Sequence, residues 1–200
     1  MPSLAHSIKT RLGIPVLADI PLEPGGAISD PPGEPFLEGV RFVRAGLQTL
    51  AASPSIVTIV PVRHSILAMT VARYIARSFA EAGRRSSTVL LTGPVPLPPL
   101  LDLPGGADLP TEAFLGPSHP AELAAPGQQA ALIVYCPPDP STLSRLNVTH
   151  SAVLLVDESC SLEAVKRSSQ MCAVAGIPVI AAAVMTRPRT RRWPFSLLHR

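Results

Sequence analysis

The stretch SIVTIVPVRHSILAMTVARYIARSFAEAGRR, residues 55–85, decides the fold. Its first part, Ile56–Val60, is a short apolar run rich in β-branched residues, which predicts a buried strand. A loop follows at Pro61–Ser65, and then a helical pattern that ends at Gly83, a residue suited to a helix C-cap. Strand, loop and helix in this order carry the phosphate-binding loop of nucleotide-binding proteins. This loop has no glycine, and no lysine precedes the helix, so it lacks the residues that bind phosphate.

The same alternation of apolar runs and helical patterns continues along the chain. Ser161 is the expected N-cap of the last long helix. Near-continuous apolar strands indicate a sheet that is covered on both faces. The predicted fold is therefore α/β, a doubly wound, mostly parallel sheet with helices on both faces. Strands are expected at residues 12–20, 56–60, 88–91, 131–135, 152–156 and 178–185, long helices at 36–50, 66–82 and 161–175, and short helices at 141–147 and near Thr111 and Pro120.

Composition places the chain in the globular class. With 200 residues, 46% of them hydrophobic and 16% charged, one domain can bury a large core. Residues 1–35 are expected to form a turn-rich linker segment, 36–186 the domain and 187–200 a basic tail. No apolar run approaches the roughly 20 residues that span a bilayer, and no signal-like apolar core is present. Three cysteines without C-x-x-C spacing predict free thiols, a reducing cytoplasmic location and no metal site.

The helical pattern at residues 36–50 carries a charged stripe. Glu38, Arg41 and Arg44 are spaced three apart and so lie on one slowly drifting side of a helix. From the residues alone, this pattern is typical of a solvated helix face with a weak local ion pair.

Six segments in order carry a resemblance to a known family. They are LGIPVLADIP at 12–21, EGVRFVR at 38–44, TVARYIARSFAEAGRR at 70–85, GPSHPAEL at 116–123, ALIVYCPP at 131–138 and AVLLVDESCSLEAVKRSSQMCAVAGIPVIAAAVM at 152–185. Together they resemble the cytoplasmic ATPase domain of bacterial tyrosine kinases (BY-kinases) of capsule and exopolysaccharide biosynthesis. That domain belongs to the P-loop ATPase group, which also includes the chromosome-partitioning proteins. The resemblance covers about residues 12–186 and implies a P-loop NTPase-like fold.

The positions that depart from the family pattern are those that bind phosphate and magnesium in the family. A Walker A loop needs glycines whose amides wrap the phosphates, a lysine on the β- and γ-phosphates and a hydroxyl on magnesium. The lysine position falls here on Ala68 and the magnesium hydroxyl on Met69. The second acidic motif reads TGPVP at residues 92–96, and the Walker B aspartate falls on Tyr135. The aligned loop, for which the resemblance implies no nucleotide binding, consists of His64, Ser65, Ile66, Leu67, Ala68, Met69 and Thr70.

These departures favour a non-catalytic pseudo-kinase or pseudo-ATPase without a cofactor or catalytic residues. The resemblance implies that it acts as a regulatory or assembly partner in exopolysaccharide or capsule biosynthesis. Glu38, Arg41 and Arg44 match the family's E-x-x-R-x-x-R helix, which contacts neighbouring subunits. The expected partners are a second copy, an active kinase paralogue, and a membrane chain-length or polysaccharide export protein, whereas nucleic acid is not expected. The expected location is cytoplasmic, with peripheral attachment to the inner face of the membrane through a partner.

Two alternatives stay open. A divergent tyrosine kinase or ATPase would bind Mg-ATP through an altered loop, with Arg63 and His64 replacing the lysine, or with Asp157 and Glu158 at the sheet edge. A partitioning-type surface or nucleic-acid-binding module would use the arginines of RPRTRRWPF, residues 187–195. The only tyrosines, Tyr74 and Tyr135, are expected to be packed rather than phosphorylated.

Overall fold

Six parallel strands form the sheet in a computed structural model that describes residues 3–50, 56–63, 65–82, 85–90, 130–136, 143 and 151–188. Their order across the sheet is β1-β6-β5-β2-β4-β3, and every neighbouring pair runs parallel. Parallel neighbours require crossover connections, because a strand must return to its starting edge before the next one begins. The strands are β1 (Val16–Pro21), β2 (Ile56–Pro61), β3 (Arg85–Leu90), β4 (Ala130–Tyr135), β5 (Ser151–Asp157) and β6 (Val179–Thr186).

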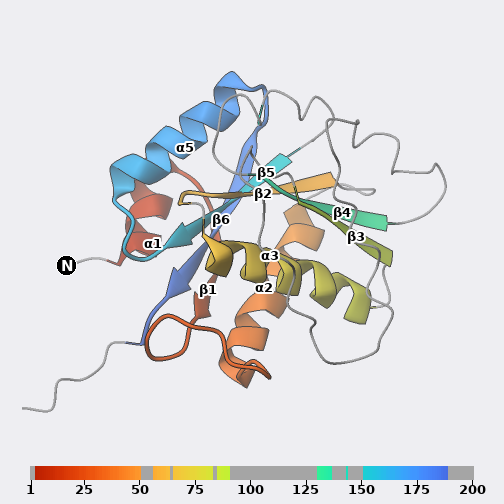
Figure 1. The fold of residues 1–200 in the computed structure, drawn as a ribbon. Helices are drawn as coiled ribbons and strands as arrows, with labels where there is room; N and C mark the ends of the chain where they lie inside the picture. The colour runs from red at the N-terminus through yellow and green to blue at the C-terminus, as the bar shows by residue number, and fades with distance from the viewer. Residues whose placement is uncertain are drawn as a thin grey trace, which may run out of the picture.

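Helices cover both faces of this sheet (Figure 1). One face carries α2 (Glu34–Leu50) and α3 (Ile66–Glu81). The other carries α5 (Leu162–Val174) and an N-terminal pair, α1 (Leu4–Ser7) and the π-helical turn η1 (Ile8–Leu12). The expected doubly wound α/β fold is therefore confirmed. Within the described part of the chain, no helix combines the length and the apolar character needed to cross a membrane.

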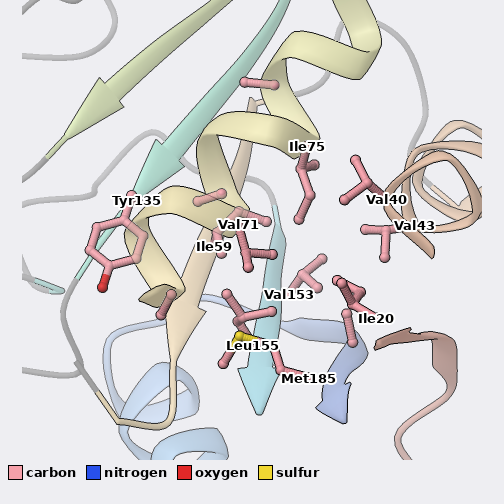
Figure 2. Close-up of a cluster of buried hydrophobic side chains, with 14 of the residues drawn as sticks. Ile20, Val40, Val43, Ile59, Val71, Ile75, Tyr135, Val153, Leu155 and Met185 are labelled. Atoms are coloured by element: carbon pink, nitrogen blue, oxygen red, sulfur yellow. The ribbon is translucent and has the colours of Figure 1, made fainter. Parts of the chain in front are cut away.

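Two hydrophobic cores hold the layers together, one on each face of the sheet. Successive residues of a strand point to opposite faces, so Val153 and Leu155 of β5 enter one core while Leu154 and Val156 enter the other. Full burial of such a side chain stabilises the fold by about 1.5–3 kcal/mol relative to exposure. This double burial explains why β5 reads as a continuous apolar run. Figure 2 shows the core beneath α2 and α3, which includes Ile20, Val40, Val43, Ile59, Val71, Ile75 and Met185.

The long helices begin and end close to their expected limits. α2 starts two residues before the expected residue 36, and α3 ends one residue before the expected residue 82. Ser161 caps α5 as expected, because its Oγ accepts a hydrogen bond from the Ala164 amide at 3.2 Å. Of the helix expected at 141–147, Leu143 alone is described, and it is helical. The cap expected at Gly83 and the short helices expected near Thr111 and Pro120 lie outside the described residues.

The N-terminal segment is part of the folded unit. Ile8 of η1 is completely buried in the core beneath α5, and β1 pairs in parallel with β6. Residues of the segment 1–35, which is expected to be a turn-rich linker, therefore contribute a strand to the sheet and side chains to the core, while the domain boundaries stay a prediction. The helices before β1 are too short to show a helical repeat of apolar residues, which is why the sequence pattern did not reveal them.

Candidate functional site

The candidate site lies at the carboxyl end of β2, in the middle of the sheet. From β2 the chain passes through α3 to β3 and β4 on one side, and later to β5 and β6 on the other. In open α/β sheets, ligands bind in the crevice at such a reversal of strand order. The residues that follow β2, β4 and β5 therefore form the site, and they include the loop identified in the sequence.

The start of α3 is capped by the protein itself. Ser65 lies before the first helical residue, and its Oγ accepts a hydrogen bond from the Ala68 amide at 3.1 Å. Its carbonyl oxygen accepts a second bond, from the Met69 amide at 3.1 Å. Amides at a helix start otherwise lack partners within the helix and form the anion-binding end of a phosphate loop. Here a serine side chain takes one of them.

The other described residues of the loop are buried or form hydrogen bonds within α3. Ala68, at the lysine position, is completely buried, and Met69, at the magnesium position, is buried in the core beneath α2 and α3. The Thr70 hydroxyl donates a hydrogen bond to the Ile66 carbonyl one turn earlier, at 2.9 Å. Leu67 packs against the same core. His64 lies outside the described residues, so its predicted role stays untested by this geometry.

Tyr135 occupies the end of β4, at the position expected for the Walker B aspartate. It lies opposite Ile59 in the parallel pairing of β4 with β2, and its side chain is only 1% exposed. Burial raises the pKa of its hydroxyl far above the ordinary value, while a hydrogen bond with the backbone of Ser65 acts in the opposite direction. Figure 2 shows the ring beside the first turn of α3.

Asp157 ends β5 at the same edge, and both of its carboxylate oxygens are engaged. Oδ2 lies 3.1 Å from Nη2 of Arg187, and Oδ1 accepts a hydrogen bond from the Ser159 amide at 2.8 Å. Burial raises the pKa of this carboxyl, but the hydrogen bonds from Ser159 and Arg187 outweigh burial and hold the pKa below its ordinary value. Glu158 is exposed beside it. Asp157 is thus ionised and already paired.

A second basic residue, Arg63, lies at the end of β2 and is exposed. Burial raises the pKa of the nearby Cys160 thiol, and the negative charge of Asp157 also raises it, whereas a hydrogen bond with the Asp157 backbone and the positive charge of Arg63 lower it. The net direction is upward, so the thiol stays protonated at neutral pH.

The described residues at this edge do not match the groups that hold Mg-ATP. A triphosphate carries about four negative charges, which need cationic and dipolar compensation in a cleft of low dielectric. The described loop offers no lysine. Asp157 at the end of β5 has both carboxylate oxygens engaged, one of them by an arginine. Among the described residues, no three His, Cys, Asp or Glu side chains gather into a metal-binding group. The second acidic motif, at residues 92–96, lies outside the described residues.

The second candidate surface is the outward side of α2. Glu38 is exposed, and so is Arg41, which forms an ion pair with Glu34, the first residue of α2. Arg44 turns the other way, and its Nη1 donates to the Ser78 carbonyl of α3 at 2.7 Å. The three residues therefore do not form the single stripe expected from their spacing. Residues three apart on a helix are rotated relative to one another, so Arg44 points closer to α3 than Glu38 and Arg41 do. Its hydrogen bond to Ser78 therefore links α2 with α3.

Sequence reasoning missed Phe42 on this surface. Its side chain is 56% exposed, on the same side of α2 as Glu38 and Arg41. The sequence does indicate that Phe42 is exposed, because this residue falls outside the apolar repeat formed by Val40, Val43 and Leu47. Leu50, which does fit that repeat, is nevertheless 47% exposed at the end of the helix.

The two tyrosines are both packed, as expected. The ring of Tyr74 on α3 meets Phe36 of α2 edge to face, with ring centres 5.2 Å apart and planes at 85°. Burial raises the pKa of the Tyr74 hydroxyl. Whether either tyrosine is phosphorylated stays a prediction.

Comparison with solved structures identifies the class of fold. The BceF tyrosine kinase domain matches with a TM-score of 0.62 and 11% identity, covering 92% of this chain and 98% of that one. The kinase domain of the Escherichia coli tyrosine kinase ETK matches with a TM-score of 0.61 and 13% identity, covering 90% and 93%. The chimerical protein CapA2B2 matches with a TM-score of 0.59 and 13% identity, covering 90% and 98%. No protein-family model and no curated protein matches.

This protein therefore has the doubly wound α/β fold that these solved structures share. More narrowly, the fold is that of bacterial tyrosine-kinase domains, which confirms the resemblance drawn from the sequence. The loss of the Walker motifs' function stays a prediction.

Proposed function

We propose that this chain is a non-catalytic relative of BY-kinase domains that acts by binding, as a regulatory or assembly partner in exopolysaccharide or capsule biosynthesis. The observation that carries the proposal is the outward side of α2. There Phe42 is 56% exposed beside the exposed Glu38 and Arg41. A large exposed aromatic residue flanked by charges is typical of a protein contact surface.

The arrangement at the carboxyl end of β2 supports the absence of catalysis. The hydroxyls of Ser65 and Thr70 form hydrogen bonds with backbone groups of α3, and the side chains of Ala68 and Met69 are buried. The described loop contains no lysine, and its one arginine, Arg63, is exposed. Such a site has no evident means of balancing the charge of a triphosphate.

The charges on α2 suggest the kind of partner. Glu34 and Glu38 lie on one helix with Arg41, so the surface carries both signs and can complement a copy of itself or a similar helix. A second copy or an active kinase paralogue is therefore the proposed primary partner. A membrane chain-length or export protein would place the assembly at the inner face of the membrane, with this domain in the cytoplasm.

Sedimentation velocity tests this proposal, on the protein alone over a range of concentrations and mixed with a BY-kinase domain. We expect concentration-dependent association that is lost when Phe42→Ser is combined with Arg41→Ala. Val174→Ser is the matched control, because Val174 is 91% exposed on α5, on the opposite face of the sheet. Equal masses for the wild type and the α2 variant under all conditions would contradict the proposal.

A divergent ATP-binding kinase or ATPase is the second candidate. Asp157, ionised at the sheet edge, and the exposed Arg63 favour it. It predicts phosphotyrosine on the purified protein and ATP turnover that Arg63→Ala and Asp157→Asn abolish. The remaining alternative, a surface or nucleic-acid-binding module, depends on the arginines of residues 187–195, of which Arg187 alone is described and is paired with Asp157. It predicts binding to DNA or anionic vesicles that disappears at high salt.

A further inference from the structure

The face of the sheet that carries α1, η1 and α5 has a marked excess of positive charge. Four exposed basic side chains lie on these elements, Lys9, Arg11, Lys166 and Arg167. Glu163 is the one acidic residue of the three elements, and none of the four basic side chains forms an ion pair with a described residue. On the opposite face, α2 and α3 carry four basic and three acidic residues, so the charges there nearly balance.

The chain brings the ends of η1 and α5 to one corner of the domain. η1 leads through residues 13–15 into β1, and α5 leads through residues 175–178 into β6. Because β1 and β6 are parallel neighbours, their beginnings lie side by side. η1 and α5 also contact each other and pack on the same core. Figure 1 shows α1 and α5 together on the side of the sheet away from α2 and α3. The four basic residues therefore belong to one surface.

The same corner presents apolar groups to solvent. Val174, the last residue of α5, is 91% exposed. The neighbouring exposed residues at the two strand beginnings are also uncharged: Gly13, Pro15, Ala173, Gly176 and Pro178. Residues 168–186 contain no charged side chain at all. An apolar tip bordered by lysine and arginine is typical of protein surfaces that lie in the headgroup region of a membrane.

We propose that this corner, the amino-edge surface, docks on an anionic lipid bilayer. Its residues are Val174 and the four basic residues Lys9, Arg11, Lys166 and Arg167. Lipid suits both features, because its phosphate groups attract the basic side chains and its acyl region accepts the valine. A nucleic acid would neutralise the charges but would leave Val174 without an apolar partner. Docking here leaves α2 uncovered on the other face, so the domain can bind a membrane and a protein partner at once.

Co-sedimentation of the full chain with vesicles tests the charge. We expect binding to vesicles that contain phosphatidylglycerol and none to vesicles of phosphatidylcholine alone. Arg167→Gln should weaken the binding roughly fivefold. Arg77→Gln is the matched control, because it removes an exposed arginine from α3, on the opposite face, and changes the net charge equally. Equal affinity of the wild type and Arg167→Gln, or equal losses in the two variants, would overturn the amino-edge surface.

Substitution of Val174 separates lipid from nucleic acid as the occupant. Val174→Ser should weaken vesicle binding roughly tenfold, because apolar side-chain surface is lost from the bilayer contact. Val174→Leu keeps that surface and should bind at least as tightly as the wild type. Binding to a DNA duplex that Val174→Ser leaves unchanged, without binding to vesicles, would overturn the proposal in favour of nucleic acid. Since α2 lies on the opposite face, these measurements and the assembly function fail separately.

Discussion

Arg187 and Asp157 join the ends of two strands, with Nη2 of the arginine 3.1 Å from Oδ2 of the carboxylate. Asp157 ends β5, and Arg187 follows β6. The aspartate side chain is only 12% exposed, so the pair is more than a solvated surface contact. Arg187 also lies against Gly26, in the turn that precedes α2. One guanidinium thus connects the sheet edge with the loop that leads to α2.

Asp157→Asn should destabilise the fold in a pH-dependent way. Hydrogen bonds hold the pKa of Asp157 below its ordinary value, so the folded state favours the charged form. The stabilisation is therefore fully present above the unfolded pKa of about 3.9 and is lost as the pH falls through the lower folded pKa. At pH 7 we expect the free energy of unfolding to fall by about 1–2 kcal/mol.

Urea unfolding of wild type and variant between pH 7 and pH 3 measures this difference. Glu158→Gln is the matched control, since it removes the same charge from the exposed neighbouring residue and should change stability little. A difference between wild type and Asp157→Asn that stays constant down to pH 3 would show that the ion pair is not its source.

Gly26→Ala should act through Arg187. Gly26 has φ +77°, and a Cβ there would lie 3.1 Å from Nε of Arg187. Gly25 has φ +93°, but a Cβ there would meet nothing within 4 Å. Gly25→Ala should therefore cost only the left-handed backbone strain, about 1–2 kcal/mol, whereas Gly26→Ala should add a clash.

Thermal unfolding of both glycine variants, alone and combined with Arg187→Ala, separates the cost of backbone strain from the cost of the clash with Arg187. We expect Arg187→Ala to remove an excess of roughly 0.5–1 kcal/mol from Gly26→Ala and nothing from Gly25→Ala. Strictly additive effects at Gly26 would mean that Arg187 does not pack there in solution.

Arg44→Met should weaken the packing of α2 on α3. The change removes the bond from Nη1 to the Ser78 carbonyl, and its expected cost is about 1–2 kcal/mol. The same change at Arg41, whose ion pair with Glu34 is exposed, should cost at most about 0.5 kcal/mol. Urea unfolding gives both values, and sedimentation velocity should show the opposite ranking for association. Equal effects of the two variants in both assays would argue against separate roles.

The layers of the fold were predictable from local sequence patterns. β5 is buried on both faces and reads as an apolar run, and α3 shows its inner face as a helical repeat, so their types and limits follow from neighbouring residues. The short helices that bury Ile8 were missed, because too few residues repeat there.

Of the candidate site, only the residues that differ from a phosphate-binding loop were predictable from the sequence. The absent lysine and glycines are visible in the loop itself. The burial of Tyr135 opposite Ile59 depends on the pairing of β4 with β2, strands that are far apart in the chain. The inward turn of Arg44 depends likewise on where α3 presents the Ser78 carbonyl. Long-range register decides both, and periodicity within one segment carries no record of it.

Calorimetric titration of Mg-ATP and Mg-ADP into protein purified free of nucleotide tests the loss of the nucleotide site most directly. With Ala68 completely buried at the lysine position, the Ala68 amide bonded to Ser65 Oγ and no lysine in the described loop, we expect no binding heat at millimolar nucleotide. Saturable binding at micromolar concentration, abolished by Thr70→Ala or Arg63→Ala, would contradict the non-catalytic assignment and show that the altered loop still cradles phosphate.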